Sequence, residues 1–496
     1  MKKTDALIII PNARSDVYQE LSGNLAAVEP PIWAAMIARH LLVKGYSAVL
    51  LDTEAEQLTM PQTVSKLPDY DARLIIIVVY GQQPSASTQN MHAASKLCTL
   101  IKDSCPESKV MLLGGHVSAL PERTLIEEKA DFVCQGEGPR TITALLEIDL
   151  DDISRYPKVP GLWYREEGRP VFTFPAPLIK QEELAFELPG MALELLPMSR
   201  YRAHNWHCFG SIHDRQPYVS IYTSLGCPFK CSFCCINAPF GKPGFRYWDP
   251  GHMIKQFDLL AEKYNICNIK IADEMFVLNE NHFLTLCRLL KERNYGFNIW
   301  AYARIDTVKP GHLEALKSAG VNWLALGIES GSKYVRDGVS KGRFGQEDIR
   351  NIVRTIRDAG INIIGNYIFG LPDDNFDTMQ ETLGMAMELN CEMANFYSAM
   401  AYPGSALYNS AVLNKWELPE TWLGYSQHSY ETFPLRTSSL TSGEVLAFRD
   451  KAWHKYFTDP SYLDFIKGKF GVETHDHIVE MTKHTLKRKY AVELQL

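Results

Sequence analysis

Three cysteines lie close together near the middle of the chain, at Cys227, Cys231 and Cys234, with the spacing CxxxCxxC. Thiolates are soft ligands that select zinc or an iron–sulfur cluster. A structural zinc or a closed cluster needs a fourth protein ligand. Cys235 is expected to point away because it adjoins Cys234, and the next cysteine, Cys267, lies far downstream. The loop therefore predicts three protein ligands and one open coordination position, where chemistry can occur.

Phe233 stands immediately before the third cysteine. The spacing together with this aromatic residue resembles the signature of the radical S-adenosylmethionine (radical SAM) superfamily. The resemblance implies a 4Fe–4S cluster on Cys227, Cys231 and Cys234, whose free iron chelates the amino and carboxylate groups of S-adenosylmethionine. It also implies that Phe233 lies near the adenine. The alternative interpretations are a zinc loop and a chance group of cysteines.

Repeated β–α units follow the cysteine loop. Apolar runs predict strands at residues 219–223, 269–272, 298–303, 323–328, 363–369 and 394–399, with helices at 253–264, 280–294, 311–319, 346–359 and 378–389. This order matches the partial (β/α) barrel of the radical SAM core. In such barrels the working face is at the carboxyl ends of the strands.

Polar residues occur at those predicted strand ends, where a strand that only packs would not need them. Two segments, 327–331 (Gly-Ile-Glu-Ser-Gly) and 368–372 (Ile-Phe-Gly-Leu-Pro), resemble radical SAM motifs that hold the cofactor. The resemblance implies that Glu329 and Ser330 bond the ammonium or ribose of S-adenosylmethionine. It assigns Arg304 to the carboxylate or to Glu329, and Lys341 is a further candidate for the carboxylate. Each residue could instead belong to a structural ion-pair network.

Two tyrosines, Tyr302 and Tyr367, are expected near the same cavity, where an aromatic residue usually packs. No catalytic acid or base can be named from the sequence.

Residues 1–150 also alternate strand and helix. Strands are predicted at 6–10, 47–51, 74–80, 110–113 and 131–134, and helices at 32–43, 88–102, 122–129 and 140–147. Unbroken apolar runs are typical of parallel strands covered on both faces. These units predict an open, doubly wound sheet that binds ligands at the carboxyl ends of its strands.

The loops at those strand ends are rich in glycine, which lets backbone approach a large ligand, although any tight turn also uses glycine. No GxGxxG follows the first strand, which disfavours a nicotinamide site. Joined to a radical SAM core, this region resembles the cobalamin-binding domain of cobalamin-dependent radical SAM enzymes. The resemblance implies cobalamin contacts from the loops after strands three, four and five, at Pro84, Ser85, Gly114, Gly115, Gly136, Glu137 and Gly138.

The DxHxxG motif that supplies a histidine to cobalt in other cobalamin proteins is absent from the sequence. The lower face of the cobalt therefore stays unassigned. His92 and His116 are expected to be a surface and a turn histidine.

The remaining chain divides into a connector at 151–215, a barrel at 216–405 and a helical region at 406–496. A small hairpin is predicted near residues 161–174, and His204 to Cys208 are expected to pack at a domain junction against cobalamin or substrate. Residues 444–457 have helical spacing of apolar residues. We expect the helical region to cap the barrel and to shape the substrate pocket.

The composition restricts partners and location. A net charge of −7 over 496 residues argues against a surface that binds nucleic acid by neutralising phosphates. The 11 cysteines show no disulfide framework, and a thiolate-ligated cluster needs a reducing compartment. The longest apolar run, 74–80, is far too short to span a membrane. These features predict a cytoplasmic protein without membrane or nucleic-acid partners.

The predicted fold class is α/β, with a doubly wound cobalamin-binding domain, a partial (β/α)6 radical SAM barrel and a helical C-terminal region. The resemblance implies a C-methyltransferase of class B type. In that family a 5′-deoxyadenosyl radical activates a carbon of a small molecule, methylcobalamin donates the methyl group, and flavodoxin or ferredoxin supplies electrons. Two alternatives stay open: a non-methylating cobalamin-dependent oxidoreductase or cyclase, and a cobalamin sensor with a structural cluster.

Overall fold

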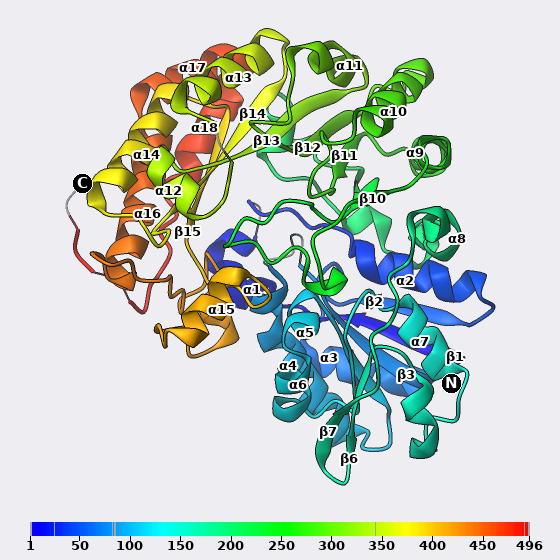
Figure 1. The fold of residues 1–496 in the computed structure, drawn as a ribbon. Coiled ribbons are helices and arrows are strands. Elements are labelled where there is room, and N and C mark those ends of the chain that lie inside the picture. Colours follow the sequence, from blue (N-terminus) through cyan, green and yellow to red (C-terminus); the bar gives the residue numbers. More distant parts are fainter. Residues whose placement is uncertain are drawn as a thin grey trace.

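The structure is a computed structural model that describes residues 2–23, 25–81, 83, 86–342, 344–490 and 492–494. Two parallel sheets, each covered by helices, lie one above the other, and the C-terminal helices stand beside the upper one (Figure 1). The α/β fold class predicted from sequence is confirmed. Two residues predicted to contact cobalamin, Pro84 and Ser85, lie outside the described residues.

The first sheet contains the predicted N-terminal strands. In spatial order they are β2 (Ala48–Asp52), β1 (Lys2–Ile10), β3 (Tyr70–Val79), β4 (Val110–Gly114) and β5 (Phe132–Cys134), all parallel. The predicted hairpin forms as β6 (Leu162–Glu166) and β7 (Arg169–Phe172), and it continues this sheet with two antiparallel strands. The strand order reverses at β1 and β3, which is where doubly wound sheets bind ligands.

Helices cover both faces of this sheet, because successive residues of a strand point to opposite faces. On β1, Ala6 and Ile8 pack into the core on the side of α2 (Ile32–Val43) and α7 (Pro139–Leu146). Leu7 and Ile9 pack into the separate core on the side of α4 (Ala86–Ser104) and α6 (Pro121–Glu127). Short helices fill the remaining connections: α1 (Arg14–Tyr18), α3 (Met60–Ser65) and α5 (Gly115–Ala119).

The second sheet is the predicted half-barrel. Its six parallel strands run in the order β15 (Met393–Ser398), β14 (Asn362–Phe369), β13 (Val321–Glu329), β12 (Asn298–Arg304), β11 (Asn268–Ile271) and β8 (Tyr218–Ile221). The connecting helices are α9 (Pro250–Tyr264), α10 (Glu280–Arg293), α11 (Leu313–Ser318), α12 (Lys333–Gly338), α13 (Gln346–Asp358) and α14 (Phe376–Leu389). A small pair, β9 (Ser224–Leu225) and β10 (Arg246–Tyr247), brackets the cysteine loop.

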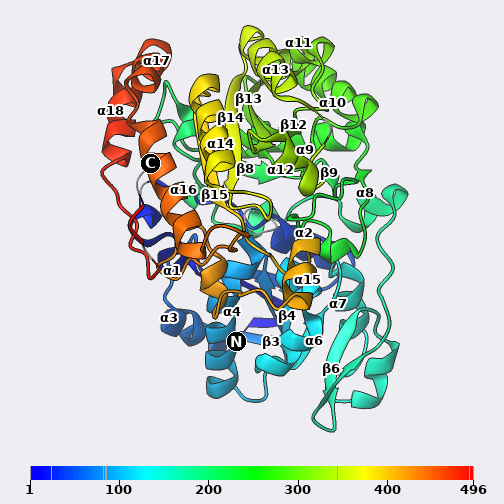
Figure 2. The same cartoon turned by 60° about the vertical axis from the view of Figure 1, so that its left-hand side comes forward.

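The C-terminal region is helical, as predicted, with α15 (Ala406–Leu413), α16 (Ser442–Phe457), α17 (Pro460–Phe470) and α18 (Val472–Met481). Helix α16 lies beside β15 and α14 (Figure 2). The connector contains one short helix, α8 (Leu184–Glu187), and its Arg202 forms an isolated bridge with Val28 of the N-terminal region. Among the described helices, none combines the length and the hydropathy that a membrane span needs.

A buried carboxyl joins the connector to the first sheet. Asp52, at the end of β2, is 2% exposed and accepts hydrogen bonds from the Tyr201 hydroxyl at 2.8 Å and from the Ala55 N–H at 3.0 Å. Burial raises the pKa of Asp52 to about 7. Because an unfolded aspartate has a pKa of about 4, the folded protein binds the extra proton and loses stability as the pH rises from about 4 towards 7.

The variant Asp52→Asn does not titrate. We compare the free energy of unfolding of the variant with that of wild type at each pH. We expect this difference to rise in favour of the variant by about 2 kcal/mol as the pH increases from 5 to 8. Urea unfolding followed by circular dichroism at both pH values measures this difference. Asp71→Asn, at an exposed position of β3, is the matched control. Parallel pH profiles for wild type and Asp52→Asn would show that the carboxyl is not held protonated.

Candidate active site

The cysteine loop is held to the barrel by a carboxylate at its first end. Asp273, which follows β11 and has no exposed surface, accepts hydrogen bonds from the Thr223 N–H at 2.6 Å, the Thr223 hydroxyl at 2.5 Å and the Ser224 hydroxyl at 2.7 Å. Burial raises the pKa of Asp273 to about 6. The next residue, Glu274, accepts a hydrogen bond from the Gly226 N–H at 3.1 Å. The carboxyl end of β11 therefore fixes where the loop begins.

The rest of the loop is tied to other elements through its backbone. The Asn237 amide donates to the Cys227 carbonyl at 3.0 Å, and its oxygen accepts from the Cys227 N–H at 3.4 Å. Ser232 donates its N–H to the Val339 carbonyl at 3.0 Å and accepts from the Leu407 N–H at 2.8 Å. The thiols are thus carried on a loop that the barrel and the C-terminal region hold from both sides.

The three cysteines open into a cavity of about 1060 Å³ between the two sheets. Among the residues predicted from sequence, Cys227, Cys231, Cys234, Phe233, Arg304, Glu329 and Lys341 all line it. Cys235, which was expected to point away, also borders the cavity. The C-terminal region contributes residues of α16 and residues 484–486 to the wall, which fits the expectation that it shapes the pocket.

Alternation along the strands decides which barrel residues face the cavity. On β12 these are Trp300, Tyr302 and Arg304, with Ala303 also at the cavity, and on β14 they are Ile364, Asn366 and Ile368. Tyr302 therefore lies at the cavity, and its hydroxyl accepts a hydrogen bond from the Gln83 amide of the first domain at 2.5 Å. Tyr367 falls between the inward positions of β14 and stacks on Phe396, with 5.4 Å between ring centres. The prediction that Tyr367 lies near the cavity is therefore wrong.

Arg304 points at the cysteine loop. Its guanidinium donates to the Cys231 Sγ at 3.5 Å and lies over the Phe229 ring, 3.8 Å from its centre. Two further hydrogen bonds, of 2.8 and 2.9 Å, join it to both carboxylate oxygens of Asp306, and a third reaches the Lys341 carbonyl. Arg304 therefore pairs with Asp306. The resemblance implied Glu329 as one possible partner of Arg304. A cation fixed in this way stabilises negative charge on the Cys231 sulfur.

Glu329 pairs instead with Lys341, whose Nζ lies 2.6 Å from Oε1. A side chain at Gly327 would place its Cβ 2.5 Å from that Nζ and 2.6 Å from that Oε1, so a larger residue there would displace the ion pair. Glu329 itself has a positive φ of 66°, at a register shift between β13 and β14, which turns its carboxylate inward. Ser330 is fully buried, does not line the cavity and shares a 3.0 Å hydrogen bond with the Thr382 hydroxyl.

The predicted cobalamin loops at β4 and β5 lie away from the cavity lining. A Cβ at Gly114 would stand 2.1 Å from the Val79 carbonyl oxygen, so this glycine allows close backbone packing. Gly115 begins the buried helix α5, and Gly136 and Gly138 turn with positive φ around the buried Glu137. Glu137 pairs with Arg246 of the barrel at 2.8 Å and accepts the Ile179 N–H at 2.8 Å.

The first domain reaches the cavity mainly at the switch point between β1 and β3. The residues that it contributes are Tyr18, Leu21, Leu25, Ala26, Glu29, Gln83, Ala86 and Gln89. His116 is not a turn residue as expected. It is buried in α5, where its ring meets Trp422 of the C-terminal region edge-on, with 4.4 Å between centres.

These residues fit the implied cofactors. Within the described chain, no three His, Cys, Asp or Glu side chains are grouped as one metal ion would need. A cluster bonds each thiolate to a different iron, so three thiols on one loop that line a cavity suit it. The negative charge of Glu329 suits the amino group of S-adenosylmethionine. The positive charges of Lys341 and Arg304 suit its carboxylate group. The switch-point wall and the cavity volume fit a large flat ligand such as cobalamin.

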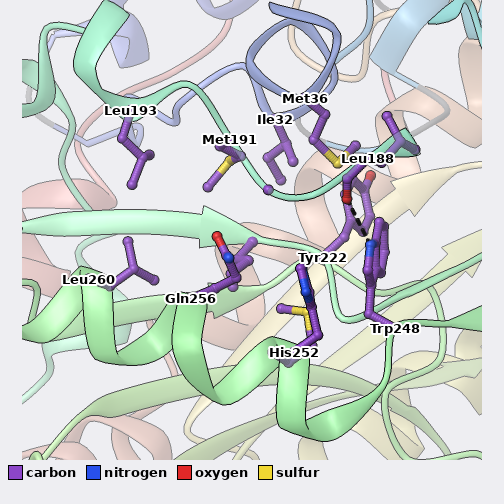
Figure 3. A pocket seen from close by; sticks show the side chains of 13 residues that line it. Ile32, Met36, Leu188, Met191, Leu193, Tyr222, Trp248, His252, Gln256 and Leu260 are labelled. Carbon is purple, nitrogen blue, oxygen red and sulfur yellow. Dashed lines mark hydrogen bonds between the residues drawn. The ribbon is translucent and has the colours of Figure 1, made fainter. Parts of the chain in front are cut away.

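A second, much smaller cavity of about 20 Å³ lies between α2, the connector and α9 (Figure 3). Its wall is mostly apolar. Two polar groups at its rim are already bonded: Trp248 donates to the Leu188 carbonyl at 2.9 Å, and His252 contacts the Pro189 carbonyl at 3.1 Å. The space suits about one water molecule, so it is a gap in packing rather than a ligand site.

Comparison with known protein families agrees with this arrangement. A model described as the radical SAM superfamily matches residues 221–386, and one described as the B12 binding domain matches residues 21–146. The chain belongs to the cobalamin-dependent radical SAM enzymes. The cluster, S-adenosylmethionine and cobalamin predicted from sequence are confirmed as cofactors of this family.

Individual relatives of this cobalamin-dependent radical SAM enzyme extend over nearly its whole length. It is 27% identical to an uncharacterised methyltransferase of Pyrococcus horikoshii over 491 residues, 99% of both chains. It is 24% identical to the anaerobic magnesium-protoporphyrin IX monomethyl ester cyclase of Rubrivivax gelatinosus over 468 residues, 92% of this chain and 78% of that one.

A solved structure shares the fold. The radical S-adenosylmethionine methyltransferase TsrM of Kitasatospora setae, with cobalamin and a 4Fe–4S cluster bound, superposes with a TM-score of 0.66 at 17% identity. The match covers 93% of this chain and 90% of that one.

Arg304 gives the cobalamin-dependent radical SAM enzyme a testable electrostatic feature. Removing the positive charge beside Cys231 in Arg304→Gln should make the cluster harder to reduce, because hydrogen bonds to the sulfurs set the potential. We expect the reduction potential to fall by roughly 40 mV, equivalent to about 1 kcal/mol for one electron. A redox titration followed by electron paramagnetic resonance measures it. Arg350→Gln, in an exposed ion pair with Glu388, is the matched control, and an unchanged potential in Arg304→Gln would contradict the assignment.

Proposed function

We propose that this protein is a C-methyltransferase that methylates an unactivated carbon of a small molecule. The observation that carries the proposal is that the cysteine loop of the barrel and the switch-point residues of the first domain line one cavity. A substrate held there can meet both cofactors without leaving the protein. The name of the Pyrococcus horikoshii relative, a methyltransferase that matches over the full length, supports the same reaction class.

The bound cofactors would supply a 5′-deoxyadenosyl radical, which removes a hydrogen atom from the substrate, and a methyl group on cobalt that replaces it. One S-adenosylmethionine would provide the methyl group and leave as S-adenosylhomocysteine, with one electron needed to return the cobalt to its methyl-accepting state. A second S-adenosylmethionine, cleaved with another electron, would leave as methionine and 5′-deoxyadenosine. The protein's own part is to hold the reactants together and to keep water away from them.

We propose that Cys227, Cys231 and Cys234 ligate the cluster. Their loop is fixed by Asp273 at one end, so the three thiols would hold the cluster at the wall of the cavity. The buried Glu329–Lys341 pair would hold the methionine part of S-adenosylmethionine. The Glu329 carboxylate would accept a hydrogen bond from it and the Lys341 ammonium would donate one.

In the same proposal, Phe233 borders the adenine, and Arg304 acts chiefly on the Cys231 sulfur. Ser330 would stabilise the segment that carries Glu329 through its hydrogen bond with Thr382. Cobalamin would lie against the switch-point residues. The predicted group Gly114, Gly115, Gly136, Glu137 and Gly138 would act by shaping the strand ends beneath it.

A flavodoxin or ferredoxin is the proposed electron donor, since the reaction would consume two electrons in each cycle, one to cleave S-adenosylmethionine and one to return the cobalt to its methyl-accepting state. A reducing compartment such as the cytoplasm suits the thiolate ligands. The net charge of −7 disfavours nucleic acid as a partner.

A non-methylating reaction is the second candidate, because one relative, which matches 92% of this chain, is named a cyclase. A cyclase uses the same radical but transfers no methyl group to the product. The two candidates therefore differ in the fate of the methyl group of S-adenosylmethionine, which can be followed with a label.

The deciding experiment is anaerobic turnover of the reconstituted protein with cobalamin, a reductant and S-adenosylmethionine that carries a labelled methyl group. We expect both 5′-deoxyadenosine and label transferred to cobalamin. Cys231→Ala should lose both, because the cluster lacks a ligand. Cys267→Ala, an exposed thiol outside the cavity, is the matched control and should keep both. Formation of 5′-deoxyadenosine without label on cobalamin would indicate the non-methylating reaction, and neither product with cobalamin still bound would indicate a sensor.

A further inference from the structure

Two buried polar atoms of opposite kind belong to side chains that line the cavity. The Oε1 of Glu29 is an acceptor and the Nε1 of Trp300 is a donor, and neither has a hydrogen-bond partner among the described residues. The Glu29 side chain is 3% exposed and Trp300 is 3% exposed, yet both line the cavity. An unpaired buried acceptor or donor costs free energy, so each is expected to have a partner in the working protein.

The other oxygen of Glu29 is already occupied. Its Oε2 lies 2.8 Å from the Nζ of Lys270, whose side chain is 2% exposed, and 3.2 Å from the Ser220 hydroxyl. Burial alone would raise the pKa of Glu29, but Lys270 and His204 together hold it at about 2, so the carboxylate stays charged. The ion pair is neutral as a whole. A further buried charge would have no counter-ion here, and a neutral partner fits best.

The donor and the acceptor lie on either side of Lys270. Lys270 and Trp300 are neighbours in register on β11 and β12, and the Nζ is 5.0 Å from the centre of the indole. Two more rings complete the wall: Trp206 meets Trp300 edge-on at 5.1 Å, and His204 stacks on Trp206 at 5.3 Å. The His204 Nε2 is the nearest nitrogen to the Glu29 Oε1, at 3.5 Å, which is the long limit of a hydrogen bond, and burial lowers the pKa of His204.

The place of this group within the barrel separates it from the reacting centre. Trp300, Tyr302 and Arg304 face the cavity in succession along β12, and Arg304 contacts the Cys231 sulfur. A strand rises about 3.3 Å per residue, so the Trp300 level is about 13 Å below the Arg304 level. That separation equals the length of a small organic molecule, with its reacting carbon near one end and its recognition group near the other.

We propose that Glu29 and Trp300 bind a neutral group of the substrate that both donates and accepts a hydrogen bond, namely a primary amide or a hydroxyl. The group donates to the Glu29 Oε1 and accepts from the Trp300 Nε1, and the aromatic wall covers the flat part next to it. The inference rests on the proposed function only in that it takes the bound molecule to be the substrate. The amide side chains of cobalamin have the same chemistry, and the test below separates the two sources.

The test measures binding, not turnover. Wild-type protein loaded with cluster, cobalamin and S-adenosylmethionine is titrated with benzamide, N,N-dimethylbenzamide and benzoate, followed by ligand-observed nuclear magnetic resonance. Only benzamide can both donate and accept without adding charge. We expect it to bind about fivefold more tightly than either of the other two, the effect of one net hydrogen bond. Equal binding of the three, or binding of none, would overturn the proposal.

Two variants locate the site. Trp300→Phe keeps the ring and removes the donor, and Glu29→Gln can keep its oxygen on Lys270 while turning an N–H towards the cavity. Glu29→Gln should weaken benzamide about fivefold and leave N,N-dimethylbenzamide unchanged, because the tertiary amide has no N–H to donate. Trp300→Phe should weaken both amides about fivefold, because the carbonyl of each accepts from the indole N–H. Trp163→Phe, remote from the cavity and bonded to Gln135, and Glu194→Gln, in an exposed ion pair, are the matched controls.

Cobalamin affinity is measured on the same variants. If it falls while benzamide binding is unchanged, the partner is a corrin amide and the substrate assignment is overturned. If both are unchanged, only water occupies the site and the proposal fails. An unaltered cluster absorbance and melting temperature exclude misfolding. Since no step requires turnover, failure of methyl transfer in the labelling experiment leaves this result intact, and the reverse also holds.

Discussion

The constraint on which this structure depends is that a six-stranded parallel sheet has two edges and cannot enclose a cavity alone. β8 and β15 are those edges. Radical chemistry needs a space from which water is excluded, so the remaining walls must come from elsewhere. They come from residues near Glu29, from the connector around Trp206, from α16 and from residues near His484. The domains are therefore parts of one enclosure rather than independent modules.

The sequence predicts the repeated elements well because their causes are local. Apolar runs covered on both faces give the strands of both sheets, and Pro31 and Gly45 mark the ends of α2 correctly. The cysteine loop is equally readable, because spacing and residue type specify its ligands. The hairpin was predicted too, but its place as β6 and β7 in the first sheet depends on pairing with β5, which no local pattern encodes.

The site is only partly readable for the same reason. Side chains alternate between the two faces of a strand, so Arg304 at the cavity predicts that Trp300 on β12 also faces it. The same alternation on β14 predicts that Tyr367 faces away. Glu29 and Lys270 leave no such trace. They are 241 residues apart and become partners only when the first domain meets the barrel. The loops after β4 and β5 show a further limit, since a glycine that permits backbone contact, such as Gly114, looks the same in sequence as a glycine that admits a ligand.

The segments that complete the cavity come from opposite ends of the chain. The Gln19 amide donates to the His428 carbonyl at 2.6 Å and to the Lys487 carbonyl at 3.2 Å, across 409 and 468 residues. During synthesis the cysteine loop is therefore made, and can fold with its barrel, before the residues that close the enclosure leave the ribosome. Until the C-terminal residues pack against the first domain, the wall that they contribute to the cavity is missing and the thiols border an open space.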